Sequence, residues 1–191
     1  DSLNSSLTLS EYNGNQISCN GFTDGFINIQ ANGGTSNYTY YFNDTLITNT
    51  SISGLAAGTY TDSIVDANGC VFTETITLTE PVMLNSVLST INISCNGLND
   101  GSATVTATGG TPGYLYLWSD GQTNPTATGL TIGTYSCVIT DANGCSVLVS
   151  ATISEPTPIV ISLDSLTNVT VYGGNDGALF TSAYGGVSSF T

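Results

Sequence analysis

Apolar and polar residues alternate along short segments of this chain, and each segment ends in a cluster of Gly, Asn, Asp or Pro. Residues 102–108 read Ser-Ala-Thr-Val-Thr-Ala-Thr, so an apolar side chain occupies every second position. Successive side chains of a strand point to opposite faces, and the pattern therefore predicts strands with one buried face. Later segments place on that face Tyr114, Tyr116, Trp118, Tyr135, Cys137, Ile139, Val147, Val149, Ala151 and Ile153. No segment has a helical period.

The same succession of motifs occurs twice. Residues 17–81 and 93–156 both contain Ile-Ser-Cys-Asn-Gly, Asp-Gly, Gly-Gly-Thr, Gly-Thr-Tyr, Asp-Ala-Asn-Gly-Cys and Glu-Pro, in that order. Cys19 and Cys95 are 76 residues apart, and Asp-Gly and Gly-Gly recur at that spacing after Pro156. A fixed period of this size indicates tandem copies of one small domain. We predict a first repeat at 1–80, a second at 81–156 and the start of a third, incomplete one at 157–191.

Short strands separated by turn residues predict an all-β fold, in which each repeat of about 75 residues is a small Ig-like β-sandwich. The Asp-Ala-Asn-Gly sequence joins the last two strands. Asp66 and Asp141 are expected to cap this turn through their side chains, and Gly69 and Gly144 to adopt positive φ. A type I turn followed by a glycine bulge would shift the strand register by one residue and place Ile139 beside an apolar neighbour.

Four of the five cysteines form two equivalent pairs, since Cys19 and Cys70 of the first repeat recur as Cys95 and Cys145 of the second. A domain this small buries only about 60–65% of its unfolded surface, and covalent cross-links are expected. We predict one disulfide inside each repeat, Cys19–Cys70 and Cys95–Cys145, each worth about 4 kcal/mol in the chain-entropy account. Paired cysteines in turn indicate an oxidising location.

The copies differ at a few positions. Val171 stands where the third repeat should have its first cysteine. Cys137 falls on an inward strand position and is expected to be a buried thiol, although a bond from Cys95 to Cys137 is an alternative. Asp62 takes the place of Cys137 in the first repeat, and Glu74 should face it across the strands. This pair has two interpretations: a wet sheet edge, or a calcium site, the one cofactor the sequence suggests.

The chain contains no Lys, Arg or His, and its 14 acidic residues give a formal net charge of −14. Nucleic-acid binding depends on Lys and Arg and is not expected. Ser–His and Cys–His nucleophile pairs cannot form, so we predict that the protein is not an enzyme. The sequence lacks a run of 18 apolar residues, and we expect no membrane insertion. The apolar fraction of 40% is still sufficient for folded cores.

The ordered motifs Cys-Asn-Gly-x-x-Asp-Gly, Gly-Gly-Thr-Pro-Gly-Tyr, Gly-Leu-x-x-Gly-Thr-Tyr, Asp-Ala-Asn-Gly-Cys and Glu-Pro resemble the SprB repeat of Bacteroidetes surface proteins. This resemblance implies a large, filamentous, extracellular cell-surface adhesin that takes part in gliding motility and is exported by type IX secretion. It also implies three kinds of partner: neighbouring repeats of the chain, the gliding or secretion machinery with its accessory proteins, and an external surface or polysaccharide.

The resemblance gives meaning to a further motif, because secreted proteins of that phylum carry O-glycans at Asp-Ser or Asp-Thr before an aliphatic residue. The motif occurs four times and makes candidates of Ser2, Thr45, Ser63 and Ser165. Two other functions stay open at this stage: an array of carbohydrate-binding modules that uses Tyr41 or Trp118, and a non-catalytic appendage of a secreted enzyme.

Overall fold

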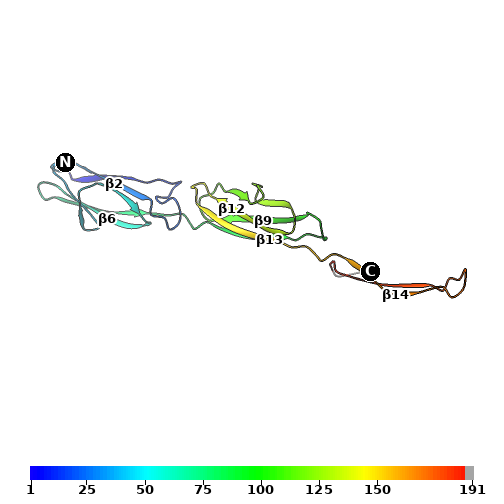
Figure 1. The fold of residues 1–191 in the computed structure, drawn as a ribbon. Coiled ribbons are helices and arrows are strands. Elements are labelled where there is room, and N and C mark those ends of the chain that lie inside the picture. Colours follow the sequence, from blue (N-terminus) through cyan, green and yellow to red (C-terminus); the bar gives the residue numbers. More distant parts are fainter. Residues whose placement is uncertain (188–191) are drawn as a thin grey trace. The chain divides into compact units, whose positions relative to one another are not determined.

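The computed structural model describes residues 1–187, and all the regular elements of this part are β-strands (Figure 1). Residues 188–191, the end of the predicted third repeat, lie outside it. The first repeat forms seven strands: β1 (Asn4–Leu9), β2 (Gly25–Asn32), β3 (Thr39–Phe42), β4 (Thr45–Ile47), β5 (Ser51–Leu55), β6 (Gly58–Val65) and β7 (Val71–Leu78).

These strands make two sheets, β1-β2-β5 and β4-β3-β6-β7, with antiparallel neighbours. The alternation along β2 sends Ile27 and Ile29 into one core with Ile64 of β6 and Ile76 of β7, and Figure 1 shows β2 and β6 in separate layers. The two sheets therefore cover a shared apolar interior, which is the architecture of a β-sandwich.

The second repeat has the same order of elements, except that no strand equivalent to β4 occurs in its described residues. Its strands are β8 (Asn85–Ile91), β9 (Gly101–Thr108), β10 (Leu115–Trp118), β11 (Thr126–Leu130), β12 (Gly133–Thr140) and β13 (Ser146–Ile153). They pair as β11-β9-β8 and β10-β12-β13. The residues that alternation assigned to the interior include the fully buried Val105, Trp118, Cys137, Ile139 and Ile153. The all-β fold class, with small Ig-like sandwiches in tandem, is confirmed.

The third repeat contributes an antiparallel hairpin of β14 (Val160–Thr167) and β15 (Ala178–Tyr184). The backbone hydrogen bond beside the open end of this hairpin has a counterpart in the second repeat. Gly186 N–H donates to Thr157 O at 2.8 Å, and Gly110 N–H donates to Val82 O at 2.7 Å. Residues 157–187 thus follow the path by which the second repeat begins.

Two compact units emerge from the backbone contacts, and their boundary differs from the predicted repeat boundary. The first unit comprises Asp1–Val87 together with Ala107–Leu115 and Val138–Val147. The second comprises Leu88–Thr106, Tyr116–Cys137 and the chain from Leu148 onward. The first unit therefore includes a loop and a turn that belong to the second repeat by sequence.

Asp-Gly occurs at the same position in both repeats, and the packing around the glycine explains why. A Cβ at Gly25 would lie 2.6 Å from Ile17 Cδ1 and 2.7 Å from Leu55 O, and a Cβ at Gly101 would be crowded in the same way by Ile153 and Leu130. Glycine is therefore needed where the strand begins, directly after the aspartate that shapes the preceding loop.

The described part of the chain contains no helix that could span a membrane.

Candidate functional site

The site consists of two kinds of segment, each present in both repeats. We call Ile-Ser-Cys-Asn-Gly the loop and Asp-Ala-Asn-Gly-Cys the turn, so that Cys19 and Cys95 are loop cysteines, and Cys70 and Cys145 are turn cysteines.

The turn of the first repeat is built on one carboxylate. Asp66 Oδ1 accepts hydrogen bonds from the N–H groups of Asn68 (2.9 Å) and Cys70 (2.8 Å), and Oδ2 accepts one from Thr35 N–H (3.0 Å). These bonds, that from Thr35 foremost, hold the pKa of Asp66 below its usual value. Gly69 closes the turn at φ 82°.

The turn of the second repeat has the same geometry. Asp141 accepts from the N–H groups of Thr111 (2.8 Å), Asn143 (2.9 Å) and Cys145 (2.9 Å), and Gly144 has φ 85°. The predicted roles of both aspartates and both glycines are therefore confirmed. The register of β6 with β7, where Ile64 pairs with Phe72, is the one that the predicted bulge requires.

The loop is shaped by a second carboxylate. Asp24 accepts from Ser18 N–H at 3.1 Å and from Ser18 Oγ at 2.5 Å, and Cys19 O accepts from Phe22 N–H at 3.0 Å. Glu80, from the end of the repeat, accepts from Gly21 N–H at 2.6 Å. The loop is thereby attached to the Glu-Pro segment that ends its own repeat.

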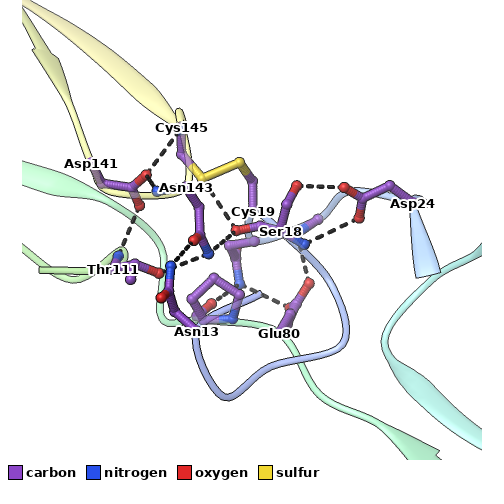
Figure 2. Close-up of a disulfide and its surroundings, with 12 residues drawn as sticks. Asn13, Ser18, Cys19, Asp24, Glu80, Thr111, Asp141, Asn143 and Cys145 are labelled. Atoms are coloured by element: carbon purple, nitrogen blue, oxygen red, sulfur yellow. Dashed lines mark hydrogen bonds between the residues drawn. A yellow bond between two sulfur atoms is a disulfide. The ribbon is translucent and has the colours of Figure 1, made fainter. Parts of the chain in front are cut away.

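A disulfide joins the loop of the first repeat to the turn of the second. Cys19 is bonded to Cys145, with a Cα–Cα distance of 5.7 Å and a sequence separation of 126 residues (Figure 2). The predicted pairs Cys19–Cys70 and Cys95–Cys145 are therefore wrong, and so is the alternative of Cys95 with Cys137. The bond links different repeats within the first compact unit.

The reason is the length of a strand. The loop with Cys19 precedes β2, whereas the turn with Cys70 packs on Thr35, which follows β2. Eight residues of β2 at about 3.3 Å each span roughly 26 Å. A disulfide needs Cα atoms within about 7 Å, so a loop cysteine and a turn cysteine of one repeat cannot meet.

Hydrogen bonds accompany the disulfide (Figure 2). Asn143 Nδ2 donates to Ser18 O at 3.0 Å and to Thr111 Oγ1 at 2.9 Å, and Asn13 Nδ2 donates to Asn143 Oδ1 at 2.5 Å. The asparagine of the turn therefore contacts its own repeat and the preceding one. Sequence reasoning missed Asn143, although its recurrence as Asn68 in the shared motif was visible.

The remaining cysteines fall into two groups. Cys70 and Cys95 are exposed free thiols. Cys137 is fully buried in β12, as its alternation predicted, and burial raises the pKa of its thiol. Of the two exposed cysteines, Cys70 is a turn cysteine and Cys95 is a loop cysteine.

The predicted neighbours Asp62 and Glu74 pair directly across β6 and β7. Asp62 is fully buried, and neither of its carboxylate oxygens has a hydrogen-bond partner among the described residues. Burial, and next the charge of Glu74, raise the pKa of Asp62 from 3.8 to about 6. Glu74 itself accepts a hydrogen bond from Ser5 Oγ.

Calcium at Asp62 and Glu74 stays a prediction to which the donor set gives little support. Calcium takes six to eight oxygen ligands, and the side chains here supply two carboxylates and the Ser5 hydroxyl. Residues 1–187 contain no group of three or more His, Cys, Asp or Glu side chains suited to a metal. Protonation of Asp62 is the simpler way to reduce the cost of burying its charge.

The aromatic candidates for carbohydrate binding differ in exposure. Trp118 is buried, and its Nε1–H donates to Asn124 O at 2.9 Å. Tyr41 is half-buried in β3. Trp118 therefore offers no stacking face to a sugar.

Residues 88–123 match the family model described as SprB repeat, which confirms the resemblance on which the sequence interpretation relied. No curated protein matches the chain. Among solved structures, the amphioxus IgVJ-C2 molecule is similar at 16% identity, over 78% of this chain and 96% of that one, with a TM-score of 0.31.

The disulfide can be tested by peptide mapping without reduction. After oxidation in a glutathione buffer and alkylation, we expect Cys19 linked to Cys145, and alkylated Cys70 and Cys95. Cys145→Ser should lower the free energy of unfolding by up to about 5 kcal/mol, the chain-entropy value for a separation of 126 residues. Cys95→Ser, the matched control, should leave urea unfolding unchanged. Recovery of Cys19 linked to Cys70 would contradict this pairing.

The buried carboxyl predicts an unusual pH dependence. The pKa of Asp62 is higher in the folded protein than its ordinary value of 3.8, so its stabilising contribution is complete below pH 4 and is lost as the pH rises through about 6. At 1.36 kcal/mol per pKa unit this amounts to up to about 3 kcal/mol.

Asp62→Asn should therefore unfold at higher urea than the wild type at pH 7.5, and the advantage should disappear at pH 4. Glu74→Gln, which removes the smaller cause, should give part of the effect. Millimolar CaCl₂ at pH 7.5 is expected to leave the wild-type midpoint unchanged. A rise with calcium that Asp62→Asn abolishes would restore the metal-site interpretation.

Proposed function

Residues 88–123 are similar to the SprB repeat, and from this we propose that the chain is a non-catalytic repeat segment of a large, filamentous cell-surface adhesin. The match indicates a repeat of the adhesin type, and the sandwich architecture is typical of non-catalytic modules. We further propose that the adhesin acts in gliding motility and surface attachment, and that type IX secretion exports it.

One observation carries the mechanical part of this proposal: the disulfide between the loop of one repeat and the turn of the next. Tension applied to the chain ends passes from Cys19 through the sulfur atoms to Cys145. The residues between them are shielded from extension as long as the bond is intact. A cross-link of this kind suits a protein that transmits force.

The charge of the chain supports an extracellular repeat rather than a binding domain for polyanions. A net charge of −14 without one Lys or Arg gives no means of neutralising phosphates. Uniformly negative repeats also repel one another, which would keep neighbouring filaments apart. The disulfide is typical of oxidising surroundings and supports a secreted or surface location.

O-glycans are part of the proposal. Ser2, Thr45 and Ser165 are exposed, and Ser63 is half-exposed beside the buried Asp62, so all four candidates offer at least part of a hydroxyl to an enzyme. Glycopeptide mapping of protein from its native cells should find hexose on at least one of them. Unmodified peptides at all four positions would contradict this.

The shielding predicts a length difference in single-molecule pulling. Reduction of the disulfide should lengthen the extended chain by on the order of 450 Å, from 126 residues at about 3.6 Å each. Cys145→Ser should show the longer extension without reductant, and Cys95→Ser should behave as the wild type. Equal extension before and after reduction would contradict the shielding.

The cellular role is tested on intact cells that make this protein. An antibody raised against the 191-residue chain should label unpermeabilised cells, and deletion of the gene should reduce attachment to glass and spreading on agar. Re-expression of the full gene should restore both. Labelling that requires permeabilisation, or a deletion strain that attaches and spreads normally, would contradict the proposed adhesin.

Neither alternative function has an observation in its favour. A carbohydrate-binding array needs exposed aromatic platforms, and Trp118 is buried. A non-catalytic appendage of a secreted enzyme would share the same folded repeats, and the gene deletion distinguishes it from an adhesin by its effect on attachment.

A further inference from the structure

We propose that each loop cysteine bonds the turn cysteine of the repeat that follows it, so that Cys95 is a half-cystine for the turn of the repeat beginning at residue 157. By the same rule, Cys70 is the partner for the loop cysteine of any repeat that comes before it in the array. This proposal concerns the covalent connection between repeats and goes beyond the proposed function, because it would hold for any tandem array of these domains.

The loop of the second repeat is already shaped like the bonded loop of the first. Ser94 N–H and Oγ donate to Asp100 at 3.1 and 2.5 Å, the same distances as those between Ser18 and Asp24. The Ser94 bonds hold the pKa of Asp100 below its usual value. Cys95 O accepts from Leu98 N–H at 3.1 Å, as Cys19 O accepts from Phe22 N–H.

The attachment of the loop to the end of its own repeat is also reproduced. Gly97 N–H donates to Glu155 at 2.9 Å, and Asn96 Nδ2 donates to Pro156 O at 3.2 Å. In the first repeat, Gly21 and Asn20 make the corresponding bonds to Glu80 and Pro81. The loop with Cys95 therefore presents its sulfur from the backbone arrangement that positions Cys19.

The cleft beside Cys95 has walls equivalent to those of the cleft beside Cys19. Around Cys19 a cleft of about 220 Å³ is lined by Met83 and Leu84, by Gly144 and Cys145 of the turn, and by Ser146. Around Cys95 a cleft of about 330 Å³ is lined by the equivalent residues Pro158 and Ile159 together with Gly186 and Val187. The two clefts therefore share two walls, one from the loop and one from the start of the following repeat.

The third repeat supplies the surface on which its own turn would rest. In the second repeat, Thr111 N–H donates to Asp141, and Thr111 O accepts from Ala142 N–H at 3.1 Å. Val187 follows Gly186 as Thr111 follows Gly110, so its backbone can make both bonds. Valine has no hydroxyl, and only the side-chain bond between Thr111 and Asn143 has no equivalent there.

The turn of the first repeat has the geometry of the bonded turn of the second repeat. Asp66 presents Cys70 as Asp141 presents Cys145, yet Cys70 is exposed. In the bonded turn Asn143 Nδ2 donates to Ser18 O, whereas the equivalent Asn68 Nδ2 donates to Thr35 Oγ1 of its own repeat at 2.8 Å. Cys70 and Asn68 are thus positioned for a preceding loop.

Val171, in the cysteine position of the third loop, determines which later turns need a cysteine under this proposal. Thr170 and Asp176 keep the loop shape in the third repeat, with bonds of 3.1 and 2.5 Å, but Val171 stands in the cysteine position. The third repeat therefore cannot bond to the turn of a fourth. It follows that the third turn carries a cysteine, whereas bonds within each repeat would require the third turn to lack one; a fourth turn would need none.

The bond forms by thiol–disulfide exchange. The Cys95 thiol and the turn thiol lose two protons and two electrons, the sulfur–sulfur bond forms, and a small-molecule or protein disulfide accepts the electrons and protons to become two thiols. Oxidised glutathione serves as that oxidant in the experiment below.

The test extends the full chain by a copy of residues 116–156, because Thr191 lies 76 residues after Leu115. The copied Cys137 is changed to Ala, so the addition carries one cysteine, in its turn. After equilibration in glutathione buffer, acid quenching and peptic digestion, we expect Cys95 linked to the added turn cysteine and Cys19 still linked to Cys145. An intramolecular partner at an effective concentration on the order of millimolar should leave at least about tenfold less alkylated Cys95 than in the unextended chain.

Cys95→Ser in the extended chain is the matched control, and it should leave the added cysteine alkylated with the Cys19–Cys145 bond unchanged. Hydrogen exchange reports whether the added strands fold. Protected strands with an alkylated Cys95, or Cys95 linked to Cys70 or to a second copy, would overturn the proposal.

If the added strands are unprotected, the natural continuation of the chain decides. A third turn without cysteine, or with a cysteine that natural protein shows unbonded to Cys95, overturns the proposal. Loss of the cross-link would leave the surface-labelling experiment unaffected, so the two proposals fail separately.

Discussion

The span of one strand separates the loop and the turn within a repeat, and the covalent organisation of the protein depends on that distance. Cys19 precedes β2 and Cys70 belongs to a turn that packs beyond its far end, roughly 26 Å away at strand spacing. No side-chain rotation can close such a gap. The loop cysteine can be satisfied only by a turn from another repeat, and the structure contains that bond between Cys19 and Cys145.

Buried carboxylates have opposite roles in these sandwiches. Asp66 and Asp141 are buried and accept backbone N–H bonds, which fix the turn. Asp62 is also buried, but neither of its oxygens has a hydrogen-bond partner among the described residues, and its pKa rises to about 6. Asp66 and Asp141 build the turns of the site, whereas Asp62 lowers the stability of the fold at neutral pH. The second repeat replaces Asp62 by Cys137 and keeps the same fold, so this position does not need a carboxylate.

Much of the fold could be predicted because strand alternation and turn chemistry are local. The inward positions of Val105, Ile139 and Ile153 and the positive φ of Gly69 and Gly144 follow from neighbours within a few residues. The pairing of Asp62 with Glu74 also followed, since a single bulge sets the register of one hairpin. The disulfide pairs did not follow, because recurrence shows that two cysteines belong to each repeat but not which end of the sandwich each occupies.

By itself, the sequence determined the repeat, its all-β character, the turn built on Asp66 and Asp141, and the exclusion of chemistry that needs Lys, Arg or His. These depend on side-chain period, residue type and short-range hydrogen bonds. The tertiary structure alone decided that Cys19 bonds Cys145 and that Asn143 contacts the preceding loop. Those outcomes depend on where strands end in space, which is set by the length and direction of each strand and not by the order of motifs along the chain.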